Sequence, residues 1–95
     1  MYMTVRKYRL QRSEPEVREA VTAGVVPVLK TSPGFAGCWA MTCTDGDLAM
    51  VSLFDTEANA HAATDKTIEW VQAYGMHLVV MPAEAMFGGI VQKMG

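Results

Sequence analysis

An Asp-Gly pair between two apolar segments restricts the fold of this chain more than any other feature. Residues 35–43 precede the pair and residues 48–54 follow it. Asp-Gly flanked by strand-like residues is the strongest short-range signal for a β-hairpin. A two-residue turn centred on Asp45-Gly46 would place Cys43 opposite Leu48, and the rest of the pairing follows by counting outward.

This register leaves both faces of the predicted hairpin apolar. The face with small or smooth side chains is expected to lie against helices, which it allows to approach closely; it comprises Ala36, Cys38, Ala40, Ala49, Val51 and Leu53. The other face carries the large side chains Phe35, Trp39, Met41, Met50 and Phe54. A bare patch of that kind is not tolerated on a soluble monomer. We therefore expect a homodimer formed by sheet-on-sheet packing.

The first third of the chain predicts a strand followed by a helix. Residues 2–10 alternate well enough for a strand with one partly solvated side. The helix starts at Ser13, where Ser13 and Glu16 have the spacing of a capping box and Pro15 suits the first turn. An apolar stripe continues to about Lys30, and Pro27 predicts a kink or break just before it.

The last third predicts a second helix and a fourth strand. Asp55 or Thr56 would cap a helix that runs to about Tyr74 and stops at Gly75. Residues 76–82 form an apolar connector, and residues 84–93 close the chain as a strand in which Gly88-Gly89 suggests a bulge or a close backbone approach. The order βαββαβ predicts a ferredoxin-like α+β fold, with both helices on one face of a four-stranded antiparallel sheet.

Size and charge narrow the classes of function. The chain has 95 residues, a net charge of −2 and a sequence pI of about 5.5, which predicts one domain spanning residues 1–95. Nothing in this charge balance points to nucleic acid or to a membrane surface. The N-terminal stretch lacks the apolar run of a signal peptide, so we expect a cytoplasmic protein. Cys38 and Cys43 would point to opposite faces of one strand and could not bridge each other, so both are expected to be reduced and packed. A metal site would need further ligands at short spacing, and none are nearby.

Two segments resemble a known family. PGFAGCWAM (residues 33–41) and, after the hairpin, VSLFDTEANAHAA (residues 51–63) are similar to the antibiotic-biosynthesis-monooxygenase-like group of dimeric α/β-barrel proteins. Residues 68–71 and 82–84 resemble a small bacterial branch of it. The resemblance covers nearly the whole chain and implies the fold and the dimer. That superfamily includes cofactor-free monooxygenases, haem-degrading enzymes, isomerases and decarboxylases, so fold alone does not name a reaction.

Few residues of this chain match the residues that define two branches of the superfamily. Haem-degrading members carry an Asn on the first strand and a Trp and a His on the second helix. This chain has no Asn on its first strand, has Ala63 where that Trp falls, and has Trp70 and His77 only later. Haem degradation is therefore not predicted. The quinone-forming branch, which needs no cofactor, uses Asn, Trp, Tyr and Arg. Asn59, Trp70, Tyr74 and Arg6 are of those types, without a matching position.

Several side chains are candidates for a site, each with a purely structural alternative. Trp70 and Tyr74 share a helix face. They are either core residues or the walls of a site that sandwiches a flat substrate. His77 is a half-buried structural residue or a general base. Arg6 and Tyr8 share a strand face. They either form part of a solvated rim of the sheet or anchor an anionic or enolate oxygen.

The sequence thus supports one leading hypothesis and one rival. The first is a cofactor-independent monooxygenase-like homodimer that acts on a small flat aromatic or apolar molecule. In it, His77 and Tyr74 are the catalytic residues, and Trp70, Trp39, Tyr8 and Arg6 bind the substrate; no cofactor and no metal are predicted. The rival is a non-catalytic module of the same fold that binds a small ligand or a partner. Both ligand functions predict a void for a ring between helix and sheet.

Overall fold

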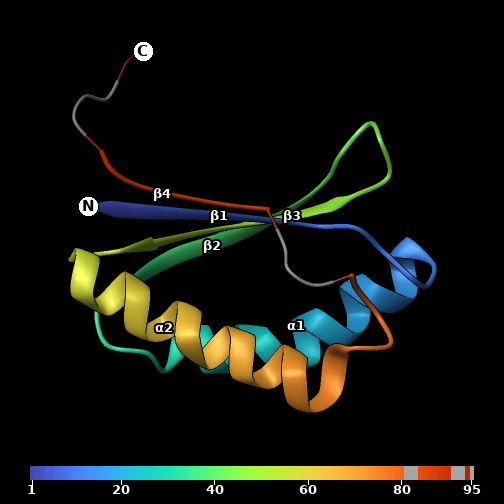
Figure 1. Cartoon of the computed structure of the whole chain (residues 1–95). Helices are drawn as coiled ribbons and strands as arrows, with labels where there is room; N and C mark the ends of the chain where they lie inside the picture. Colours follow the sequence, from blue (N-terminus) through green and yellow to red (C-terminus); the bar gives the residue numbers. More distant parts are fainter. Residues whose placement is uncertain (81–83, 91–93, 95) are drawn as a thin grey trace.

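A computed structural model describes residues 1–80, 84–90 and 94. Its elements follow one another as β1 (Tyr2–Tyr8), α1 (Glu14–Lys30), β2 (Phe35–Thr42), β3 (Leu48–Phe54), α2 (Glu57–Trp70), a π-helical turn η1 (Val71–Gly75) and β4 (Glu84–Gly89). The strands form one antiparallel sheet in the order β2-β3-β1-β4. Figure 1 shows both helices on one side of this sheet. The predicted ferredoxin-like α+β fold is therefore confirmed.

The β2–β3 hairpin forms, but its predicted register is wrong by one residue. Thr42, not Cys43, lies opposite Leu48. The N–H of Cys43 donates to the carbonyl of Asp47 and that of Gly46 to the carbonyl of Cys43, so the loop has three residues and ends in Gly46 at φ +89°. A two-residue type I′ turn would have needed positive φ at Asp45 as well. In the three-residue loop that forms, the positive φ falls on Gly46 and not on Asp45.

Because strand side chains alternate, this shift moves the large residues of β3 to the other face. Leu48, Met50 and Phe54 are buried against the helices rather than exposed on the bare face. Phe35 joins them through a register irregularity between Phe35 and Gly37. The bare face instead carries side chains from all four strands. Trp39 and Met41 lie on it, as predicted. We call this face the open sheet face, and its apolar residues are Met3, Val5, Trp39, Met41, Val51, Leu53 and Met86.

Helix α1 has the predicted limits but two different details. Ser13 is its N-cap, yet the Ser13 side chain makes no capping hydrogen bond, so the predicted capping box does not form. The helix also continues through Pro27 without a break. Pro27 deprives the carbonyl of Ala23 of its usual donor. Both residues are exposed, so water can take the place of that donor.

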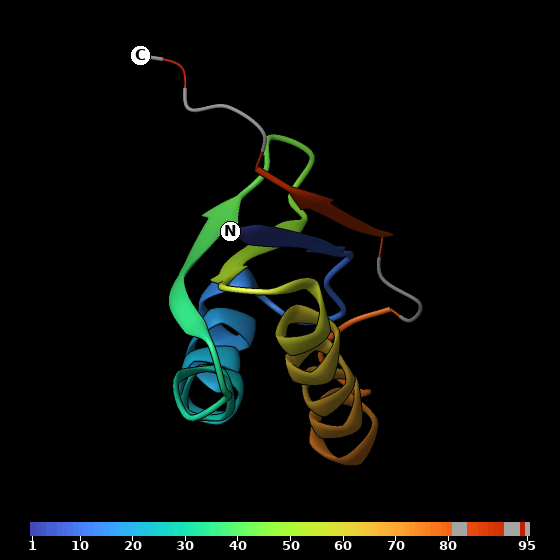
Figure 2. The ribbon, with the colours of Figure 1, turned by 90° about the vertical axis from the view of Figure 1, so that its left-hand side faces the viewer.

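Helix α2 starts at a cap and ends in a wider turn. The Thr56 hydroxyl accepts a hydrogen bond from the N–H of Asn59 at 3.2 Å, which selects Thr56 over Asp55 as the cap. The predicted helix reaches Gly75, but its last five residues are π-helical. Figure 2 shows α1 below the β2 side of the sheet and α2 nearer the β4 side. The space between this helix layer and the sheet contains the core.

The edge strand β4 is regular. Gly88 pairs with Met3 and Gly89 with Tyr2, and a Cβ atom at either glycine would meet no neighbour within 4 Å. The predicted bulge or close approach at these glycines is therefore wrong. The end of the predicted strand, residues 91–93, lies outside the described residues, as does part of the connector, residues 81–83.

Candidate functional site

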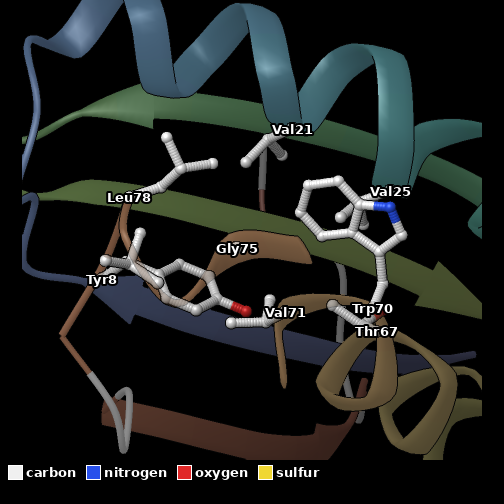
Figure 3. Close-up of a pocket in the computed structure, with 9 residues that line it drawn as sticks. Tyr8, Val21, Val25, Thr67, Trp70, Val71, Gly75 and Leu78 are labelled. Atoms are coloured by element: carbon white, nitrogen blue, oxygen red, sulfur yellow. The ribbon is translucent and has the colours of Figure 1, made fainter. Parts of the chain in front are cut away.

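A cavity lies in the core where α1, α2, η1 and β1 meet. It is enclosed by Trp70 from the end of α2, by Tyr8 from β1 and mainly by aliphatic side chains, the full lining being Tyr8, Val21, Val25, Thr67, Trp70, Val71, Gly75, Leu78 and Val79. Figure 3 shows the Trp70 indole reaching toward α1 beside Val25. The cavity volume is about 20 Å³, room for about one water molecule. The void for a ring that both ligand functions predicted is therefore not open in this structure.

Two glycines make the space for the Trp70 indole. A Cβ atom at Gly24 on α1 would overlap the six-membered ring of the indole, and one at Gly75 would lie 3.2 Å from Trp70 Cζ3. Trp70 is the last residue of α2 and is followed at once by η1. Single π-helical turns occur often at functional sites, since they reorient the side chains around them. The indole thus closes one end of the cavity at a point where the helix geometry changes.

A second cavity, also of about 20 Å³, borders the first and is more polar. The two share Tyr8, Val25 and Thr67 in their linings. The second is further lined by Arg6 and by three hydroxyl residues, Thr4, Ser52 and Thr64. Arg6 is 7% exposed and Tyr8 is 4% exposed, so the expectation of a solvated rim at these residues is wrong.

Arg6 and Tyr8 interact directly. Arg6 Nε donates a hydrogen bond to Tyr8 Oη at 2.9 Å. The guanidinium carbon also lies 5.5 Å from the centre of the Tyr8 ring, within cation–π range. Within the described part of the chain, no carboxylate forms an ion pair with Arg6. The interior therefore contains a positive charge whose one side-chain partner is a neutral phenol.

The other predicted site residues lie elsewhere. Tyr74 packs beside Trp70, with ring centres 6.0 Å apart, but it is 68% exposed and lines neither cavity. His77 is exposed just after η1. Trp39 lies on the open sheet face, on the side of the sheet away from both cavities. The structure therefore brings together Arg6, Tyr8 and Trp70 and leaves Tyr74, His77 and Trp39 outside.

Sequence reasoning missed Gly24 and the hydroxyl residues Thr4, Ser52, Thr64 and Thr67. Thr4 and Ser52 are cross-strand neighbours on β1 and β3. A run of Thr and Ser at inward positions of a strand and a helix was the available signal, but the wrong hairpin register placed Ser52 on the opposite face. Gly24 gave no signal, because only the packing of α2 reveals what lies above it.

The described ranges lack two other kinds of feature, a cluster of metal ligands and a membrane-spanning helix. No cluster of three or more His, Cys, Asp or Glu side chains suited to a metal ion occurs among residues 1–80, 84–90 and 94. None of the helices in the same ranges combines the length and the apolar character needed to cross a bilayer.

No protein-family model matches the chain, and no curated protein is similar to it in sequence. Solved structures do share its fold. SnoaB, a cofactor-independent oxygenase from Streptomyces nogalater, superposes with a TM-score of 0.76 at 14% identity, over 98% of this chain and 95% of SnoaB. The monooxygenase ActVA-Orf6 of Streptomyces coelicolor, solved with nanaomycin D, gives 0.70 at 19% identity, over 97% and 92%.

A proposed antibiotic biosynthesis monooxygenase from Bordetella bronchiseptica gives a TM-score of 0.74 at 16% identity, over 96% of this chain and 97% of that one. All three structures match almost end to end, so the likeness concerns the whole fold and not one motif. This chain therefore has the fold of the antibiotic-biosynthesis-monooxygenase-like proteins.

Proposed function

We propose that this protein is a cytoplasmic, homodimeric, cofactor-independent monooxygenase-like protein that acts on a small flat aromatic molecule between the helices and the sheet. The observation that carries the proposal is the interior lined by Trp70, Tyr8 and Arg6, in a fold that SnoaB and ActVA-Orf6 share. Aromatic walls with a few convergent polar groups are typical of small-molecule sites. The free cysteines Cys38 and Cys43 fit a reducing compartment.

A ring enters this interior only after a side chain moves. Each cavity has room for about one water molecule, and the Trp70 indole closes the outer one. Swinging the indole out of the space above Gly24 adds the volume of a bicyclic ring to the cavity. A flat substrate then takes the place of the indole, between the valines of α1 and the Tyr8 ring.

The proposed reaction needs only the substrate and dioxygen. A base removes a proton from an acidic CH₂ group flanked by aromatic rings, and the carbanion formed transfers electrons to O₂ as the C–O bond forms. Loss of water from the resulting hydroperoxide leaves a carbonyl. One oxygen atom stays in the product, and the other leaves as water with the two hydrogens of the CH₂ group. The protein's contribution is to orient the ring, accept a proton and stabilise the negative oxygen.

The residues take separate roles in this proposal. The displaced Trp70 indole lies at the outer edge of the substrate ring, and Arg6 with Tyr8 donates hydrogen bonds to the substrate oxygen. Tyr74 and His77, at the outer side of Trp70 and after η1, are the proposed proton acceptors. Both are exposed, so they act on a substrate that is bound with the indole displaced. Trp39 belongs to the dimer interface in this proposal.

The open sheet face supports the dimer. Trp39 is 56% exposed, Met41 57% and Met86 70%, and each pairs across the sheet with a smaller apolar residue of the same face. Exposed apolar area of this kind marks an interaction site. Packing two such faces together removes the large side chains from water, which is the main gain in free energy on association.

Oxygen uptake tests the enzymatic proposal. Purified protein is incubated with anthrone, dioxygen consumption is followed with an electrode, and anthraquinone is measured by absorbance. Oxygen uptake above the rate without protein is expected, with an about 100-fold or greater loss in His77→Ala or Tyr74→Phe if that residue is the base. His61→Ala, which changes an exposed histidine on α2, is the matched control. Equal rates with and without protein, for anthrone and for hydroxylated anthrones, would overturn the proposal.

The closed interior favours a second candidate, a non-catalytic dimer that serves as an interaction module. A protein without a substrate needs no void, and the two small cavities agree with that. The two candidates differ in oxygen uptake, which only the first predicts. Both predict a dimer.

A further inference from the structure

Among the described residues, Arg6 is the buried charged side chain, and no carboxylate in these ranges forms an ion pair with it. It lies on β1 facing the helices, 7% exposed. The side chains around its cavity are hydroxyl or apolar: Thr4, Tyr8, Val25, Leu29, Met50, Ser52, Phe54, Thr64 and Thr67. Taking a cation out of water costs free energy that a neutral phenol recovers only in part. An arginine kept in such a place is suited to an anion that arrives from outside.

The hydrogen bonds around Arg6 leave further donors on residues that line its cavity. Tyr8 Oη already accepts from Arg6 Nε, so the Tyr8 O–H is available to donate to another group. The guanidinium has further N–H groups beyond Nε. In contrast, the hydroxyls of Thr64 and Thr67 donate to the carbonyls of Ala60 and Ala63, at 2.9 and 3.1 Å. One cation and one phenol O–H, together with the hydroxyls of Thr4 and Ser52 in the same lining, are therefore the groups that would meet an anionic oxygen.

The neighbouring cavity fixes what the rest of the ligand looks like. It shares Tyr8, Val25 and Thr67 with the Arg6 cavity and is otherwise enclosed by Trp70 and mainly aliphatic side chains. Of these two neighbouring cavities, one has a cationic side chain, Arg6, in its lining and the other has an apolar, aromatic lining. The single positive charge matches a single negative charge and leaves a dianion such as a phosphate monoester uncompensated.

We propose that the interior binds a flat aromatic monoanion, an aromatic carboxylate or phenolate, with its charged oxygen on Arg6 and Tyr8 and its ring in place of the Trp70 indole. This inference rests on the proposed function, because it places the ligand in the same interior, and it names the charge state of the substrate. It does not depend on a reaction with oxygen. A protein that binds such anions without oxidising them would still satisfy it.

A pair of probes that differ only in charge tests the inference. In a Trp39→Phe background Trp70 is the sole tryptophan, so its fluorescence reports on the site. The protein is titrated at pH 7 with 1-naphthoate and with the neutral 1-naphthamide, and binding is confirmed by calorimetry. We expect naphthoate to bind at least about tenfold more tightly and to shift the Trp70 emission toward that of an exposed indole.

Two arginine variants identify the group that recognises the charge. Arg6→Met should bind both probes with equal affinity, whereas Arg9→Met, which changes an exposed arginine just after β1, should keep the tenfold preference. The comparison of the two probes on the Trp39→Phe protein needs no change at Arg6, so it remains decisive if Arg6→Met does not fold. Equal affinity for the two probes, an unchanged preference in Arg6→Met, or no binding of naphthoate at millimolar concentration would each overturn the inference.

The outcome is separable from that of the oxygen-uptake experiment. Selective binding of naphthoate without oxygen consumption would support the anion site and reject the oxygenase. Oxygen consumption with equal binding of the two probes would support the oxygenase and reject the anion site.

Discussion

The indole of Trp70 occupies the space in which a side chain at Gly24 would begin. This places the end of α2 directly against the middle of α1, and it makes Gly24 the residue that lets Trp70 close the interior. Any side chain at position 24 must displace the indole or push the two helices apart. The first prediction follows from this contact.

Gly24→Ala should destabilise the protein and expose Trp70. Alanine is the better helix former by about 1 kcal/mol, so a net loss of about 1–2 kcal/mol in the free energy of unfolding would report the clash. Urea unfolding measures the loss, and a red shift of Trp70 emission in the Trp39→Phe background reports the displaced indole. Gly88→Ala, where a Cβ atom meets nothing within 4 Å, is the control and should be nearly neutral. A stabilised Gly24→Ala with unshifted emission would contradict this packing.

Gly46 should be the sensitive residue of the hairpin loop. Its φ of +89° lies in the left-handed region, and none of the described non-glycine residues has a positive φ. Gly46→Ala should lower the free energy of unfolding by about 1 kcal/mol or more. Gly46→Asn should lower it less, because Asn tolerates this region better. Thermal and urea unfolding of the two variants give the ranking, and equal stability of Gly46→Ala and the wild type would rule out the three-residue loop.

Trp39→Glu should separate the proposed dimer. The indole lies 56% exposed on the open sheet face, and a buried interface tryptophan commonly contributes about 2 kcal/mol or more. The dissociation constant should therefore rise about 30-fold or more. Sedimentation equilibrium at micromolar concentration measures it. Ala23→Glu, on the exposed side of α1, is the control and should remain dimeric. A wild-type protein that sediments as a monomer would remove the basis for this interface.

The Lys7–Asp45 ion pair should be visible as a displaced titration. Lys7 Nζ lies 2.5 Å from Asp45 Oδ2. Its hydrogen bond lowers the pKa of Asp45 below the ordinary 3.8 and raises the pKa of Lys7 above the ordinary 10.5. The Asp45 contribution to stability is thus present above pH 3.8 and is lost as the pH falls through the lowered pKa. The Lys7 contribution is complete below pH 10.5 and is lost as the pH rises through the raised one.

Carboxyl NMR titration checks this pair. The pKa of Asp45 in the wild type should lie below that in Lys7→Gln, where it should return toward 3.8. Both groups are at the surface, so we expect little change in overall stability. Lys66→Gln, which changes an exposed lysine on α2, should leave the Asp45 titration unchanged. An identical Asp45 pKa in wild type and Lys7→Gln would show that the pair does not form in solution.

The sequence by itself determined the elements and their order. Local signals are enough for this: the apolar stripe and Pro15 of α1, the Thr56 cap of α2, and the apolar segments around Asp45-Gly46 each act over a few residues. Helices and strands in the order βαββαβ can pack together in few ways, so this order was enough to predict the fold class. The bare face of the sheet could also be anticipated, because Trp39 and Met41 alternate with small residues along β2.

Only the tertiary structure decided the register, the faces and the site. Asp-Gly is compatible with a two- and a three-residue loop, and the choice of the longer loop turned Met50 and Phe54 toward the helices. The alternation of β1 groups Arg6 with Tyr8 but does not say which face the helices cover. That is settled by the packing of the whole helix layer, which brings Gly24 and Trp70 together from residues far apart in the chain. Contacts of that range depend on the summed burial of many side chains, and no local pattern records them.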